Sequence, residues 1–100
     1  MNIEKKVENG RVTLIPEGWL DTVSSSELGA AVEEITEATE IVMDFAQVEY
    51  MASAGLRQVV AAHKKARLLN AAFSVIHVCP GVMSIFKMTG IDKKMSISGQ

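Results

Sequence analysis

Strand-like and helix-like segments alternate along this chain of 100 residues, and this alternation constrains its fold more than any other feature. A strand, a helix and a second strand in succession place the two strands parallel, with the helix packed across the sheet. A chain of this length forms about one domain with one core. We therefore expect a single α/β domain over residues 1–100, with a mixed central sheet of about four to five strands and three main helices.

The chain begins with two strands joined by a tight turn. Asn9-Gly10 separates a strand-like segment that starts at Ile3 from a second one at 12–15, which Pro16 closes. This dipeptide between two apolar segments is the strongest short signal for a β-hairpin. We expect an antiparallel hairpin at the N-terminal edge of the sheet.

Three helices are predicted from their capping residues. Ser24 and Glu27 have the spacing of a capping box, which predicts Ser24 as the N-cap of the first helix. The second helix is expected to start at Ser53, with the hydroxyl of this serine as its cap. Pro80 suits the first position of the third helix, and Gly90 suits a left-handed stop at its end.

Short apolar runs and helical stripes predict the core. Residues 40–45 and 71–78 are apolar and rich in β-branched side chains, which is typical of buried strands, and a last short strand is expected at 95–97. The predicted core residues are Ile41, Val42, Met43, Phe73, Val75 and Ile76 on the strands, and Leu28, Val32, Leu56, Val60 and Phe86 on the helices.

Composition and charge exclude several classes of function. A net charge of −2 argues against a protein that grips nucleic acid. One cysteine, Cys79, and two distant histidines, His63 and His77, argue against a metal centre. No segment approaches the roughly 18 apolar residues of a membrane span, and the first residues lack the apolar part of a secretory signal. We expect a cytoplasmic protein with no metal, cofactor, nucleic-acid partner or membrane insertion.

No group of side chains in the sequence points to catalysis. Ser53 and His63 would lie about 15 Å apart along one helix, too far for a nucleophile and its base. Asp21 and Asp44 lack a spacing typical of an acid–base pair. The basic run at 63–67 is typical of the polar face of a helix, because no neighbouring aromatic residues are present on which bases could stack. We expect no catalytic residue.

The small residues Ala-Ser-Ala-Gly at 52–55 stand between a predicted buried strand and the second helix. Gly55 is a poor helix former in a first turn, which suggests that something approaches it closely. Ser53 is either a cap that contributes on the order of 1 kcal/mol or a functional residue, and the local sequence alone favours the cap.

Four motifs, taken in order, resemble the STAS domain of bacterial anti-sigma factor antagonists. They are Gly18-Trp19-Leu20-Asp21, Ile41-Val42-Met43-Asp44-Phe45, Ser53-Ala54-Gly55-Leu56 and Phe86-Lys87-Met88-Thr89-Gly90-Ile91. Each motif is weak by itself, but all four occur at the right separations and on the expected elements. The resemblance covers nearly the whole chain.

The resemblance implies a partner switch. Proteins of this family bind an anti-sigma factor that is also a serine kinase and so free a sigma factor. Phosphorylation of one serine at the start of the second helix ends the binding, and a serine phosphatase restores it. In this chain that serine corresponds to Ser53, and the implied partner-binding residues are Asp21, Ser24, Ala52, Ala54, Gly55 and Leu56.

Two positions depart from the family pattern and leave a second function open. Ala52 replaces an acidic residue and Ala54 replaces a second serine. Without that acid, a second function stays open, that of a STAS subunit that binds the ATPase of an ABC-type membrane transport complex without being phosphorylated. Asp21 likewise has two explanations, contact with the partner or a favourable negative charge at the start of the first helix.

Overall fold

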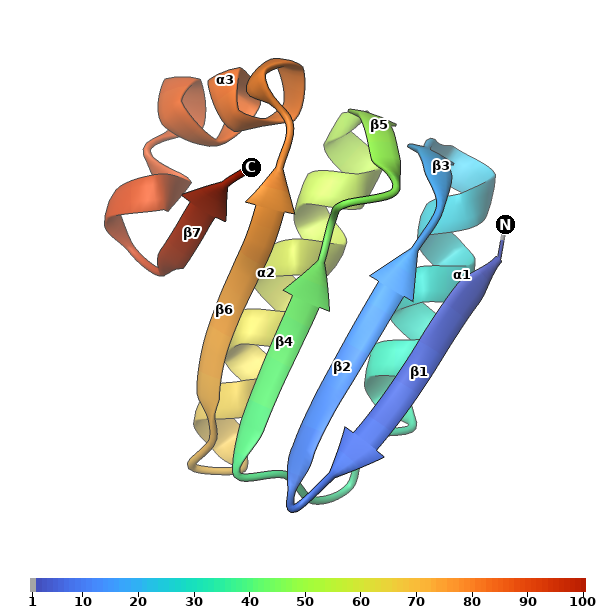
Figure 1. Cartoon of the computed structure of the whole chain (residues 1–100), viewed down its shortest axis with the longest axis vertical. Helices are drawn as coiled ribbons and strands as arrows, with labels where there is room; N and C mark the ends of the chain where they lie inside the picture. Colours follow the sequence, from blue (N-terminus) through green and yellow to red (C-terminus); the bar gives the residue numbers. More distant parts are fainter. Residues whose placement is uncertain (1) are drawn as a thin grey trace.

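The computed structural model describes residues 2–100 and shows a mixed sheet with two long helices on one of its faces (Figure 1). The elements in chain order are β1 (Ile3–Glu8), β2 (Arg11–Pro16), β3 (Gly18–Leu20), α1 (Thr22–Glu33), β4 (Glu40–Asp44), β5 (Val48–Met51), α2 (Ser53–Leu68), β6 (Ala72–Val78), α3 (Pro80–Thr89), a 3₁₀ helix η1 (Ile91–Lys93) and β7 (Ser96–Gly99).

The central sheet has five strands in the order β1-β2-β4-β6-β7. The β1–β2 pair is antiparallel and the other pairs are parallel. Leu14, Met43 and Val75 occupy matching positions on three neighbouring strands and are fully buried, on the face that α1 and α2 cover. The expected α/β fold, with a mixed sheet, an N-terminal antiparallel hairpin and three main helices, is confirmed.

The turn of this hairpin depends on two residues in the left-handed region. Asn9 has φ 50° and Gly10 has φ 83°, the combination that a two-residue turn between twisted strands favours. A side chain at Gly10 would also collide with Thr39, because an added Cβ would lie 2.6 Å from the Thr39 Oγ1. The positive φ and the lack of room for a Cβ atom therefore both favour glycine at position 10.

A second sheet, formed by the two strands β3 and β5, was not predicted from the sequence. These strands are parallel and pair Trp19 with Tyr50 and Leu20 with Met51. They continue the chain beyond the carboxyl ends of β2 and β4 (Figure 1). With three and four residues, they are too short to show a two-residue periodicity in sequence.

Most of the predicted core is confirmed, and four of the predicted residues are less buried than the others. Phe73 and Leu56 are only partly buried, although both pack against the core. Ile76 is half-buried because it lies on the sheet face opposite to Val75, away from α1 and α2. Val60 is half-buried on α2. The predicted residues that are buried are Leu28, Val32, Ile41, Val42, Met43, Val75 and Phe86.

The third helix begins at Pro80 and ends at Gly90, which has φ 76°, as expected. Its buried anchor is Phe86, whose ring stacks on Phe45 at a centroid distance of 6.4 Å. No helix within residues 2–100 combines the length and the apolar character needed to cross a membrane.

Replacing Phe86 with alanine should lower the free energy of unfolding by about 3–5 kcal/mol, because it leaves a cavity beside Phe45. The matched control is Met88→Ala on the same helix, where the side chain is 86% exposed and the change should stay within about 0.5 kcal/mol. Urea denaturation of both variants measures the difference. Equal losses would contradict the packing described for α3.

Candidate partner-binding site

Ser53 is the first residue of α2 and is exposed to solvent. It lies at the end of the molecule where β2 and β4 finish and β3 and β5 begin (Figure 1). Ala52, Ala54 and Leu56, which flank it, are half-buried. Ser53 thus stands at the surface among small and apolar side chains.

The hydroxyl of Ser53 does not cap α2, so the expected capping role is wrong. The N-cap is Ala52, which has an extended backbone at φ −86° and ψ 173°, and no side chain caps this helix. Ala52 is held extended because its backbone N–H donates to the Leu20 carbonyl at 2.8 Å, as a continuation of the β3–β5 pair. The first turn of α2 therefore presents backbone N–H groups without a side-chain acceptor, an arrangement that favours an anion.

Gly55 is buried, and the close approach expected for it comes from its own chain. An added Cβ would lie 2.8 Å from Met51 Cγ and 2.9 Å from Leu20 Cβ. Glycine at this position lets α2 pack directly on β3 and β5. Gly55, one of the predicted partner-binding residues, is buried and has an internal role in positioning α2.

Asp21 is the N-cap of α1, and the predicted capping box between Ser24 and Glu27 is wrong. The Ser24 N–H donates to Asp21 Oδ1 at 2.9 Å, and the Asp21 N–H donates to Ser24 Oγ at 2.9 Å, which forms a capping box three residues earlier. Ser24 Oγ also approaches the Trp19 carbonyl at 2.6 Å. Ser24, another predicted partner contact, is buried and serves this internal network.

These hydrogen bonds also set the charge state of Asp21. The Ser24 backbone N–H and then the Ser24 hydroxyl favour the charged carboxylate and lower the pKa of Asp21. Its side chain is otherwise exposed. The structure shows that Asp21 caps α1 and that its carboxylate is also exposed at the surface.

Asp21 and Ser53 belong to adjoining helix starts. The pairing of Leu20 with Met51 aligns the ends of β3 and β5, and α1 and α2 begin directly after these strands and pack against each other. Both helices therefore present their N-termini at the same end of the molecule (Figure 1).

A pair of exposed aromatic rings at this end was not predicted. Trp19 and Tyr50 lie on the side of the β3–β5 pair opposite to the buried Leu20 and Met51, with ring centroids 5.2 Å apart. Trp19 is 61% exposed. Exposed aromatic side chains are enriched where proteins bind one another. The sequence did not predict this pair of rings because the two short strands that carry them, β3 and β5, were not predicted either.

A second unpredicted contact joins the carboxyl ends of β4 and β6. His77 Nδ1 lies 2.9 Å from Asp44 Oδ1, and the same carboxylate oxygen accepts the Ala46 N–H at 3.0 Å. His77 is held in the left-handed region at φ 58°. In the described part of the chain, no group of three or more His, Cys, Asp and Glu side chains gathers that could hold a metal ion.

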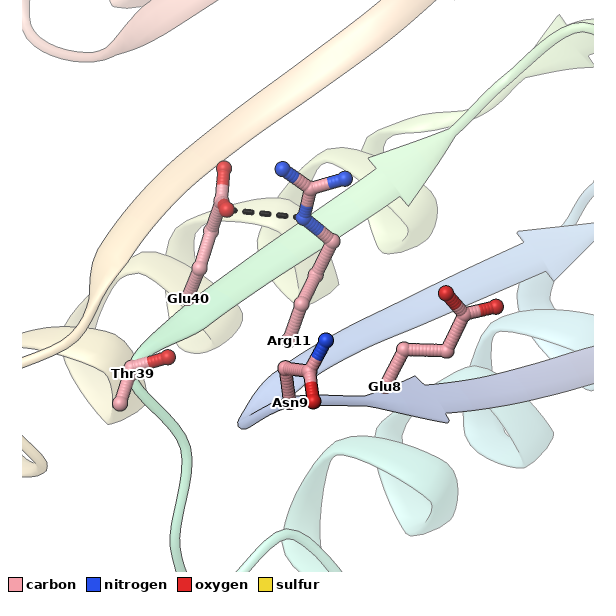
Figure 2. A pocket seen from close by; sticks show the side chains of 5 residues that line it. All are labelled: Glu8, Asn9, Arg11, Thr39 and Glu40. Atoms are coloured by element: carbon pink, nitrogen blue, oxygen red, sulfur yellow. Dashed lines mark hydrogen bonds and ion pairs between the residues drawn. The ribbon is translucent and has the colours of Figure 1, made fainter.

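A polar hollow of about 260 Å³ lies at the opposite end of the molecule, beside the β1–β2 turn (Figure 2). Arg11 is its only basic lining residue, and its Nε is 2.9 Å from Glu40 Oε1. Glu8 adds a further negative charge. Because Glu40 neutralises Arg11, this hollow offers no net positive charge to a phosphate.

Comparison with known proteins shows the family of this chain and where its fold recurs. A model of the STAS domain family matches residues 2–99. An anti-sigma factor antagonist from Mycobacterium paratuberculosis has a TM-score of 0.88 at 22% identity, covering 99% of this chain and 86% of that one. The Bacillus cell fate determinant SpoIIAA in its phosphorylated form has a TM-score of 0.77 at 16% identity, over 99% and 93% of the chains. A sulfate transporter family protein from Wolinella succinogenes has a TM-score of 0.80 at 11% identity, over 94% and 80%.

Gly55→Ala should lower the free energy of unfolding by about 1–3 kcal/mol, because the added methyl group collides with Leu20 and Met51. Gly81→Ala in α3 is the matched control, since a Cβ there would meet nothing within 4 Å. The control should be neutral or stabilise by up to about 1 kcal/mol. Thermal melts of both variants test this, and a neutral Gly55→Ala would disprove the close packing of α2 on β3 and β5.

Asp21→Asn should flatten the acid side of the stability profile. Because the folded-state pKa of Asp21 is lowered, its charge stabilises the fold at neutral pH, and this contribution is lost as the pH falls through the folded pKa. Asparagine still accepts the capping hydrogen bond but does not titrate. Melting temperatures of both proteins between about pH 7 and pH 2 should converge on acidification. A constant difference across this range would contradict the assigned pKa shift.

Proposed function

Because this chain belongs to the STAS domain family, we propose that it is an anti-sigma factor antagonist that is switched by phosphorylation of Ser53. In this proposal the unmodified protein binds an anti-sigma factor kinase and so releases a sigma factor. The observation that carries it is the exposed Ser53 at the start of a helix that no side chain caps. Similar folds in anti-sigma factor antagonists, one of them a phosphorylated form, support the same role.

A phosphate on Ser53 should leave the fold intact. It adds about −1.5 to −2 charges and three acceptor oxygens. The N–H groups and the positive end of the helix dipole at the start of α2 favour such an anion. Arg57, four residues further along the helix, is exposed and at the spacing that favours an acid-to-base pair.

The same phosphate should prevent binding of the partner. Ala52, Ala54 and Leu56 present short apolar side chains around Ser53, and a partner packed on them would exclude water from that surface. A phosphate enclosed there would lose its hydration, and pairing with Arg57 would offset only part of this cost, so binding would be strongly unfavourable. Asp21 belongs to the rim of this surface, where its carboxylate would meet a polar or basic group of the partner.

The complete switch also needs an enzyme that removes the phosphate. We assign that step to a serine phosphatase, acting on the exposed Ser53 once the complex has separated. Such a cycle of kinase, antagonist and phosphatase would operate in the cytoplasm, where sigma factors act. The chain itself contributes a binding surface and a phosphate acceptor rather than a catalytic group.

A second candidate function is supported by two observations. The sequence has Ala52 where the family pattern has an acidic residue beside the phosphorylated serine. A sulfate transporter family protein also shares the fold with a TM-score of 0.80. In this alternative the chain is a STAS subunit of an ABC-type transport complex, and Ser53 is an ordinary surface residue.

The switch predicts opposite effects for two substitutions of Ser53. Ser53→Ala should bind the partner kinase whether or not ATP is present, and its stability should change little because the hydroxyl makes no capping bond. Ser53→Asp should bind weakly because it brings a charge to the apolar surface. Affinity capture with and without ATP identifies the kinase, and titration calorimetry with the purified pair measures both affinities.

Ser26→Ala is the matched control, since Ser26 is also an exposed serine in the first turns of a helix. This variant should be phosphorylated and released like the wild type. Mapping of the modified peptide should find phosphate on Ser53 alone. Phosphate on Ser26, or ATP-independent binding of the wild type without any phosphate, would reject the switch and favour the transport subunit.

A further inference from the structure

A shallow apolar hollow of about 350 Å³ lies on the outer side of α2, starting one turn after Ser53. It shares Leu56 with the surface around Ser53 and extends from there along the helix. We name it the α2 groove, and its lining residues are Leu56, Arg57, Val60, Ala61, Lys64 and Ile91.

Val60 and Ala61 of this groove stand on the face of α2 that points away from its buried residues, whereas Leu56 and Ile91 also pack against the core. The inner face of the helix is completed by Val59, Ala62 and Ala66, which are fully buried against the sheet. A surface helix normally carries polar side chains on its opposite face. Here that face has half-buried Val60 and, further along, Leu68 at 82% exposure. This outer stripe is unpartnered within the domain.

The charges on the same helix have one sign. Residues 53–68 contain four Lys and Arg and no Asp or Glu, and two of these cations, Arg57 and Lys64, border the groove. No ion pair among the described residues involves either of them. Residues 12–56, in contrast, contain nine Asp and Glu and no Lys or Arg. The helix α2 therefore carries a basic strip, which holds four of the ten Lys and Arg of the chain and no acid.

On one side, this basic strip borders α1. A second hollow, of about 220 Å³, adjoins the groove through Ala61 and Lys64 and lies between α2 and α1. Its far side is formed by α1 and includes Glu33, an exposed acid. Negative charge on α1 therefore bounds the positive surface of α2 on this side. On the other side of the groove, exposed Lys93 and Lys94 follow Ile91 in the chain.

We propose that the α2 groove binds an acidic amphipathic helix of the protein partner. The apolar side of that helix would cover Leu56 and Val60, and its Asp and Glu side chains would pair with Arg57 and Lys64. This proposal extends the proposed function, on which it rests for the existence of a partner at Ser53. It adds a second contact surface that decides which partners fit, through charge of the opposite sign.

A protein helix fits this surface better than nucleic acid does. A duplex carries one negative charge per about 1.7 Å along its axis, and its backbone would lie over the acids of α1 as well as the cations of α2. The floor of the groove is made of aliphatic side chains and has no aromatic ring for a base to stack on. A single helix with one acidic edge meets neither obstacle.

The test uses two synthetic helical peptides of about 16 residues with the same leucine stripe, one flanked by Glu and one by Lys. Each is titrated into the ¹⁵N-labelled full chain, and the perturbed amide signals are mapped. The Glu peptide should perturb residues 56–64 and Ile91, and Lys64→Glu should weaken it about 5- to 10-fold. Lys5→Glu on β1 changes the net charge equally and should have no effect on binding.

Three outcomes would overturn the proposal: equal binding of both peptides, perturbations that map elsewhere, or a DNA duplex that perturbs the same residues while the Glu peptide does not. The test is independent of Ser53, because no kinase or phosphate takes part. If the peptide does not bind the α2 groove but the Ser53 switch works, only the groove proposal has failed. If the peptide binds but Ser53 does not act as a switch, only the proposed function has failed.

Discussion

The pairing of β3 with β5 is the contact on which the rest of the site depends. It joins Leu20 to Met51, and the Ala52 N–H extends it by one hydrogen bond to the Leu20 carbonyl. Both long helices start directly after this pair. Gly55 packs against the same residues and fixes the first turn of α2 upon them. The β3–β5 pair thereby holds the N-termini of α1 and α2 together at one end of the central sheet.

The two helix starts use their serines in opposite ways. On α1, Ser24 is buried and bound to Asp21 and the Trp19 carbonyl, so its hydroxyl is committed to the fold. On α2, Ser53 is exposed and caps nothing. A hydroxyl that contributes no internal hydrogen bond can be modified without loss of stability. This difference is the physical basis for separating a structural serine from a candidate switch.

The sequence predicted those elements whose signals are local. Asn9-Gly10 fixes the hairpin and Pro80 and Gly90 bound the third helix, because each acts within its own turn. The start of α1 was misplaced because Asp21–Ser24 and Ser24–Glu27 have the same spacing, and only the β3–β5 pair decides between them. The Asp44–His77 contact, 33 residues apart in sequence, follows from strand order alone. The significance of Ser53 came from the family resemblance, since its local sequence favoured a cap.

The central claim is that one phosphate on Ser53 abolishes partner binding while the domain stays folded. The most direct measurement compares protein phosphorylated at Ser53 with the unmodified protein, in affinity for the same purified anti-sigma factor and in melting temperature. We expect an affinity loss of at least about 100-fold, because the phosphate would lose its hydration in an apolar interface, with melting temperatures within a few degrees. Equal affinities, or a loss of binding that follows unfolding of the domain, would contradict it.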